Sequence, residues 1–263
     1  MSQTTIDDSH LPFWKRSHYL DRMTLQQLVA AYFQHYTIVV YLVVAALCLL
    51  AYAVFPASPL RTLGAVGAAL VIYPLVWHLL HQYVLHGRWM WRRKWLASTW
   101  KRIHYDHHQD PNHLEVLFGA LHTTLPTIAI ATLPVGWLIG GTGGAAASLA
   151  TGILTTCYYE FMHCIQHLSF KPKWKWVQFQ KQRHNEHHFF DEDGNYGITN
   201  YAWDRLLGTY YEKKDRPARS PTVFNLGYTE EVAELHPWVK QLSGGIASGH
   251  PRRRAMTKDG APN

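Results

Sequence analysis

The strongest constraint in this sequence is an apolar run without a charged residue, from Thr37 to Phe55. As a helix, a run of this length crosses the hydrocarbon core of a bilayer, which is about 30 Å thick. A bilayer offers no water to bond exposed N–H and C=O groups, so a helix is what satisfies the backbone of such a run. We therefore predict an all-α integral membrane protein.

Three more apolar runs continue this pattern, and short turns separate them. The runs are Leu63–Leu80, Leu114–Leu138 and Ala145–His167. The turn at residues 56–59 contains two prolines, and the turn at 140–144 contains four glycines. Pro126 and Pro134 predict kinks inside the third run rather than its end. Because the turns are too short to carry a domain, we predict four transmembrane helices in two hairpins.

The placement of basic residues predicts the orientation of these helices. The basic residues are Lys15, Arg16 and Arg22 near the N-terminus; Arg88, Arg92, Arg93, Lys94, Lys101 and Arg102 after the second run; and Lys171, Lys173 and Lys175 after the fourth. The turn after the third run carries no charge. Since an excess of Lys and Arg in short loops marks the cytoplasmic side, both termini and the basic segments after the second and fourth runs are expected there. The N-terminus lacks the pattern of a signal peptide, so none is expected.

The net charge of +7 is compatible with a nucleic acid or an anionic lipid as partner. Tryptophans alternate with the basic residues in both basic segments, as expected at the headgroup level of a membrane. Lipid is therefore the expected partner, and nucleic acid is not. Three cysteines in apolar stretches without C-x-x-C spacing predict neither disulfides nor a thiolate metal site.

We predict one catalytic domain with two flanking segments. Residues 1–36 are expected to form an N-terminal cytoplasmic or interfacial segment, residues 37–243 the membrane catalytic domain, and residues 244–263 a flexible tail. The predicted location is the bacterial inner membrane, or the endoplasmic reticulum membrane if the source is eukaryotic. The oligomeric state is left open.

Ten of the 18 histidines fall into four clusters. The clusters are His81 and His86; His104, His107 and His108; His163 and His167; and His184, His187 and His188. Residues at i, i+3 and i+4 share one face of a helix, so each triplet is expected to present its three imidazoles together. The first pair is five residues apart, which places its side chains about 140° apart on an ideal helix. Either the helix is altered there, or each member serves a different metal.

Imidazole binds iron, zinc, copper and nickel, and ten imidazoles exceed what one ion can take, so two metal ions are predicted. The predicted topology brings all four clusters to one membrane face. His78, Glu160, Asn185 and Asp191 are weaker candidates for hydrogen bonds that orient the imidazoles. Helix packing with a local hydrogen bond is favoured over this role for His78, whereas surface solvation explains each of the other three equally well. No separate catalytic acid or base is assigned, because the metal ligands are expected to carry the chemistry.

The spacing HX4H, HX2HH, HX3H, HX2HH resembles the fatty acid hydroxylase and sterol desaturase superfamily, and is most similar to its fatty acid 2-hydroxylases. The segments 194–199 and 203–209 resemble the end of the same domain. This resemblance implies that all ten histidines bind metal, that the centre holds two iron ions, and that zinc can replace iron in purified protein. It also implies a cap of cytoplasmic helices that closes the site over four membrane helices, and O2 is the expected co-substrate. Because no cytochrome-b5-type domain is visible, a separate donor is expected, either cytochrome b5-like or a ferredoxin with its reductase.

The expected activity is therefore hydroxylation of the acyl chain of a ceramide or another complex lipid. Three alternatives remain open within the enzymatic interpretation: a sterol substrate, a carotenoid substrate, or another bacterial lipid such as an ornithine lipid. Hydroxylation and desaturation are not distinguished by these residues. A membrane metal-binding or transport protein is the alternative from a different class. Transport would require ionisable groups along the membrane interior, where His122 is the one clear candidate.

Overall fold

The computed structural model describes residues 18–246. Lys15, Arg16 and most of the predicted tail lie outside the described residues. Within residues 18–246 the chain is helical and contains no strand, apart from an isolated bridge between Tyr19 and His113. This confirms the predicted all-α class.

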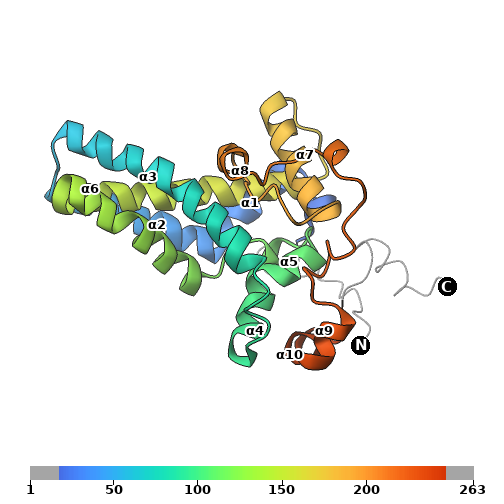
Figure 1. Cartoon of the computed structure of the whole chain (residues 1–263). Helices are drawn as coiled ribbons and strands as arrows, with labels where there is room; N and C mark the ends of the chain where they lie inside the picture. Colours follow the sequence, from blue (N-terminus) through green and yellow to red (C-terminus); the bar gives the residue numbers. More distant parts are fainter. Residues whose placement is uncertain (1–17, 247–263) are drawn as a thin grey trace, which may run out of the picture.

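The longer helices form one part of the molecule and the shorter helices the other (Figure 1). The α-helices are α1 (Leu25–Gln34), α2 (Tyr36–Val54), α3 (Pro59–Leu80), α4 (Lys94–Trp100), α5 (Asp106–Gln109), α6 (Leu121–His167), α7 (Lys175–Phe189), α8 (Ala202–Leu207), α9 (Glu230–Leu235) and α10 (Trp238–Ser243). Two π-helices, η3 (His81–Leu85) and η4 (Lys101–Tyr105), and three 3-10 turns, η2 (Leu20–Arg22), η5 (Leu114–Val116) and η6 (Lys213–Asp215), connect them. Helices α2 and α3 both pack along α6. Helices α4, α5 and α7 to α10 lie toward one end of this bundle.

Three helices in residues 18–246 are long and apolar enough to cross a membrane. They are α2, α3 together with η3, and α6. Many of their large apolar side chains are exposed, including Leu50, Leu60 and Leu138. Such a continuous apolar surface fits contact with lipid rather than with water.

Helix α6 contains 47 residues, and its backbone leaves the helical conformation at Gly140 and Gly141, inside the predicted glycine turn. The residues on either side of this break pack against each other. Ser148 Oγ donates to the carbonyl of Thr132 at 3.0 Å, across 16 positions in sequence. Helix α6 is therefore two arms that fold back on one another, as its green and yellow parts show in Figure 1.

Glycine lets these two arms approach to backbone contact. A Cβ added at Gly136 would lie 2.4 Å from Ser148 Cβ and 2.5 Å from the carbonyl oxygen of Gly144. Both distances are far below van der Waals contact between heavy atoms. Small residues at such crossings are typical of helices that associate within a membrane.

The predicted start of the third run at Leu114 is wrong, because α6 begins at Leu121. Leu114 belongs to η5, where its N–H donates to the carbonyl of His18 at 2.9 Å. Its side chain and that of Phe118 are buried in the core beside Leu20. Apolar composition alone does not separate such a core segment from a lipid-facing one.

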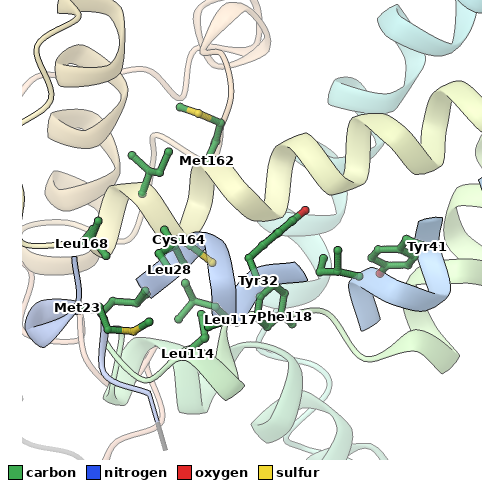
Figure 2. Packing of buried hydrophobic residues seen from close by; sticks show 14 of the residues in the cluster. Met23, Leu28, Tyr32, Tyr41, Leu114, Leu117, Phe118, Met162, Cys164 and Leu168 are labelled. Atoms are coloured by element: carbon green, nitrogen blue, oxygen red, sulfur yellow. The ribbon is translucent and has the colours of Figure 1, made fainter. Parts of the chain in front are cut away.

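A core of buried side chains joins α1 to the last turns of α6 (Figure 2). Leu28 and Tyr32 of α1 pack with Phe118, Cys164 and Leu168. The hydroxyl of Tyr32 also donates to the carbonyl of Cys157 at 2.5 Å. This core therefore fixes the last turns of α6, which carry His163 and His167, on the side that packs against α1. The three cysteines are unpaired, as predicted.

Candidate metal centre

The ten histidines of the four predicted clusters come together in two groups of five. Group A contains His81, His86, His104, His108 and His187, and group B contains His107, His163, His167, His184 and His188. Within each group, one ring nitrogen from every member lies within 4.8 Å of those of the others. All are buried except His86, which is half-buried. The groups are adjacent, since the ring centroids of His108 and His188 lie 4.2 Å apart.

The first histidine pair is explained by the π-helix η3. The N–H of His86 donates to the carbonyl of His81 at 3.0 Å, which is an i→i+5 bond. This wider turn brings residues five apart onto one side, and both side chains join group A. Of the two predicted alternatives, the altered helix is the one the structure shows.

The rings of each triplet lie together, with centroids no more than 6.0 Å apart, but the triplet is divided between the two groups, which a shared helix face does not predict. In each triplet the first and last histidines face one group, and the middle one faces the other. His104 and His108 belong to group A, whereas His107 belongs to group B. In α7 the assignment is reversed, because only His187 belongs to group A. Segments η4–α5 and α7 each contribute to both groups.

The ring nitrogens fit bound cations. Nε2 of His104 lies 3.2 Å from Nε2 of His81 and 2.8 Å from Nε2 of His86, while Nε2 of His163 lies 3.0 Å from Nε2 of His107. Nε2 of His187 is buried without a hydrogen-bond partner among the described residues. Nitrogens that converge in this way, and are removed from water, are satisfied by a metal ion at their centre.

The tautomers of three rings support the same conclusion. Nδ1 of His81 faces the carbonyl of Tyr196 at 2.7 Å, and Nδ1 of His187 faces that of Gly194 at 2.8 Å. Nδ1 of His108 faces the carbonyl of Val223 at 3.1 Å. A carbonyl only accepts, so each Nδ1 carries the proton and each Nε2 presents its lone pair inward.

Burial keeps these imidazoles neutral. It lowers the pKa of His108 to about 3, and together with neighbouring imidazoles it lowers the pKa of His104 and His184 well below the ordinary value. Neutral imidazole is the form that binds metal.

The three imidazoles are oriented by the backbone carbonyls of Gly194, Tyr196 and Val223, which follow α7. None of the four weaker candidates from the sequence supplies one of these carbonyls. Nδ1 of His78 lies 3.6 Å from the buried carboxylate of Asp204. Glu160 is buried and accepts from the N–H of Gly119 at 3.1 Å. A backbone carbonyl is present at every residue, so the amino-acid sequence carries no signal for this role.

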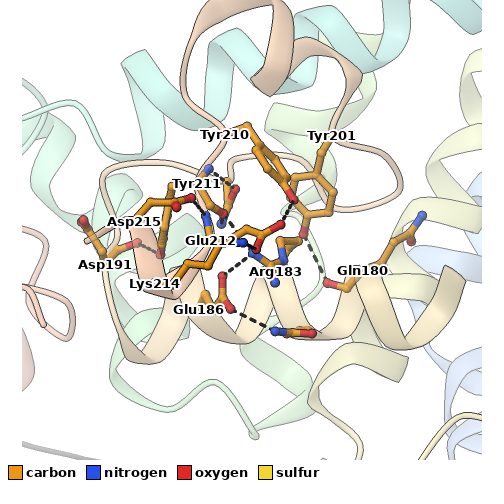
Figure 3. A network of polar contacts seen from close by, with 12 residues as sticks. Gln180, Arg183, Glu186, Asp191, Tyr201, Tyr210, Tyr211, Glu212, Lys214 and Asp215 are labelled. Carbon is orange, nitrogen blue, oxygen red and sulfur yellow. Dashed lines mark hydrogen bonds and ion pairs between the residues drawn. The ribbon is translucent and has the colours of Figure 1, made fainter. Parts of the chain in front are cut away.

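Asn185 and Asp191 are half-buried on or after α7. The carboxylate of Asp191 pairs with Arg216 at 3.1 Å rather than with an imidazole. It lies at the edge of a polar network around α7 (Figure 3). In that network Arg183 pairs with Glu186 at 2.9 Å and donates to the carbonyl of Tyr211 at 3.2 Å. This network fixes the helix that carries the last triplet.

A cavity of about 130 Å³ lies against both groups. Its histidine wall contains His81, His104, His107, His163, His184 and His188. Trp77, Leu80, Leu117 and Ile198 supply apolar walls, and Glu160 also lines it. The cavity is therefore an apolar chamber with imidazoles on one side.

Comparison with known proteins identifies a family that matches this chain. The family model for fatty acid hydroxylase matches residues 66–209. The dihydroceramide fatty acyl 2-hydroxylase FAH2 of Arabidopsis thaliana is 30% identical over 161 residues, covering 58% of this chain and 65% of the relative. The ceramide very long chain fatty acid hydroxylase SCS7 of Saccharomyces cerevisiae is 26% identical over 146 residues, covering 53% of this chain and 36% of the relative. The matched part is thus less than two thirds of either relative.

A solved structure of full-length Scs7p, with only its hydroxylase domain visible, has a similar fold. The TM-score is 0.60 at 19% identity, covering 79% of this chain and 84% of the other. The matched residues include all ten clustered histidines. The resemblance drawn from the histidine spacing is confirmed: this chain belongs to the fatty acid hydroxylase family.

Proposed function

We propose that this protein is a membrane-bound di-iron oxygenase that hydroxylates the acyl chain of a ceramide or another complex lipid. The observation that carries the proposal is the pair of five-imidazole groups facing one apolar chamber. The chamber accepts a hydrocarbon, and the imidazoles provide two metal sites beside it. The relatives named for ceramide and dihydroceramide support a sphingolipid substrate.

The donor set supports iron as the native metal. Five nitrogen ligands exceed the four of a tetrahedral structural zinc site, and imidazole is a suitable ligand for iron. When bound, two iron ions would supply the reductive activation of O2 that an unactivated C–H bond requires. Zinc is expected to replace iron in some purified samples. We propose that all ten histidines are ligands and that the electrons come from a separate donor, cytochrome b5-like or a ferredoxin with its reductase.

The residues of the chain bind and orient the substrate. Trp77, Leu80 and Leu117 offer apolar walls to an acyl chain and exclude water from the imidazoles behind them. Because the chamber lies between α3 and the two arms of α6, we infer that the acyl chain enters from the bilayer. The headgroup then stays at the membrane surface.

We further propose four membrane spans, formed by α2, α3 and the two arms of α6, with the remaining helices as a cytoplasmic cap. The break at Gly140 and Gly141 supports the division of α6, and the basic residues around the cap support its orientation. The division into residues 1–36, 37–243 and 244–263 remains a prediction, as do the cytoplasmic termini and the source membrane.

The test is comparative lipid mass spectrometry of cells that express the protein or its variants. His107→Ala removes a ligand from group B, and His187→Ala removes one from group A. Both should abolish the hydroxylated lipid. His122→Ala is the matched control, because His122 lies exposed on α6 and outside both groups. Unchanged product in either ligand variant would refute the assignment. If the product is instead a desaturated lipid, a sterol or a carotenoid, the reaction is not acyl hydroxylation.

A further inference from the structure

A buried carboxylate organises the segment that follows α7. Asp204 has no exposed surface, and its carboxylate accepts three hydrogen bonds. The donors are the N–H of Tyr196 at 2.7 Å, the N–H of Gly197 at 2.9 Å and the hydroxyl of Thr209 at 2.9 Å. We call residues 194–209 the clasp, because Asp204 closes them into a loop.

The clasp is also held from outside. Gln166 of α6 donates to the carbonyl of Ile198 at 2.7 Å, and Gln180 of α7 donates to that of Thr199. Gly194 has a φ of +152°, and a Cβ there would lie 2.6 Å from the carbonyl oxygen of Thr209. The position of the clasp backbone is therefore closely defined.

Two carbonyls of the clasp hold imidazoles of group A. Gly194 accepts from Nδ1 of His187, and Tyr196 accepts from Nδ1 of His81. The N–H of the same Tyr196 donates to Asp204. Asp204 is thus separated from one imidazole of group A by a single residue. It shares its pocket with His78, whose Nδ1 lies 3.6 Å away.

Group B is held differently. The Nδ1 atoms of His107, His167, His184 and His188 are buried, and none has a hydrogen-bond partner within residues 18–246. In group A, three of the five Nδ1 atoms donate to backbone carbonyls. Such a bond fixes the ring orientation and raises the basicity of the nitrogen that binds metal.

We propose that the two metal sites are inequivalent, and that Asp204 is a positioning residue which, through the clasp, makes group A the site that holds its metal longer. This inference rests on the metal centre in the proposed function. It requires that group B releases its metal first. It also requires that loosening the clasp affects group A and leaves group B unchanged.

The experiment follows metal release from the purified full chain in detergent. EDTA is added to protein that carries its metals, and the metal remaining per chain is measured over time by elemental mass spectrometry. The wild type should release its metal in two phases of equal amplitude. His184→Ala should remove the fast phase, and His187→Ala should remove the slow phase, which assigns each phase to its group.

Asp204→Asn should accelerate the slow phase about 10- to 100-fold and leave the fast phase unchanged, since loss of an outer partner weakens metal binding by that factor. The asparagine amide would place a hydrogen-bond donor where the carboxylate now accepts hydrogen bonds from N–H groups. Glu230→Gln is the matched control, because its exposed carboxylate pairs with Lys240, between α9 and α10. Both phases should be unchanged in it.

Thr209→Val is a second variant, to be used if Asp204→Asn does not fold, as judged by the loss of its helical circular dichroism. It removes one of the three hydrogen bonds at similar volume, so it should accelerate the slow phase by a smaller factor. Release of both metals in one phase by the wild type would overturn the inference. Equal acceleration of both phases in the folded variants would do the same. In both cases the metal centre stands, whereas protein that binds no metal would refute the proposed function itself.

Discussion

Gly136→Ala tests the contact between the two arms of α6. The added methyl carbon would lie 2.4 Å from Ser148 Cβ and 2.5 Å from the carbonyl oxygen of Gly144. Carbon atoms in contact are about 3.5–4.0 Å apart, so the arms must separate by about 1 Å. The hydrogen bond from Ser148 to Thr132, now 3.0 Å long, would then stretch to about 4 Å and be lost.

The cost has two parts. Overpacking of this kind costs about 1–3 kcal/mol, and an interhelical hydrogen bond in a membrane protein contributes about 0.6 kcal/mol. Gly67→Ala is the matched control, because Gly67 lies on α3 with nothing within 4 Å of its added Cβ. There the same substitution should stabilise the helix by about 0.5–1 kcal/mol. Because Gly136 also lies in a helix and gains the same amount, the two variants should differ in the free energy of unfolding by the overpacking and hydrogen-bond costs alone, about 2–4 kcal/mol.

The assay is reversible unfolding in mixed detergent and SDS micelles, followed by helical circular dichroism. Gly136→Ala should unfold at a lower SDS fraction than the wild type, and Gly67→Ala at the same or a higher fraction. If both variants unfold together with the wild type, the arms do not pack through Gly136, and the fold-back of α6 is wrong.

Two further predictions concern the cap and the chamber. Burial lowers the pKa of Lys181 from 10.5 to about 8. Between these two pH values the unfolded chain therefore binds more protons than the folded chain. The free energy of unfolding should then rise with pH in this range. Lys181→Met should flatten this rise in pH-dependent unfolding titrations, and equal slopes would contradict the pKa. Thr127→Trp should fill part of the chamber and shift the hydroxylated products toward shorter acyl chains in lipid mass spectrometry, with metal content unchanged. An unaltered chain-length profile would show that the acyl chain lies elsewhere.

Much of the fold could be predicted because its main signals are local. The uncharged run at residues 37–55 and the glycines at 140–144 act over a few residues, and both correspond to features of the structure. The early start predicted for the third run at Leu114 shows the limit of such signals. Burial beside Leu20 depends on a distant segment, and no local pattern reports it.

The histidine set could be predicted in membership but not in grouping. The spacing identifies the ten residues, yet it does not show that His107 turns to a different group from His104 and His108. That division depends on which helices lie opposite. The proposed role of Asp204 is equally hidden, because two of its three hydrogen-bond donors are backbone N–H groups.

The π-turn at η3 has a consequence for insertions and deletions. On an α-turn, residues four apart share a face, whereas η3 brings residues five apart to the same group. Deleting one residue between His81 and His86, such as Val84, would leave a four-residue separation that an ordinary α-turn could accommodate. We therefore expect the fold to absorb one extra residue by changing helix type, so that two chain lengths would be compatible with the same pair of histidines.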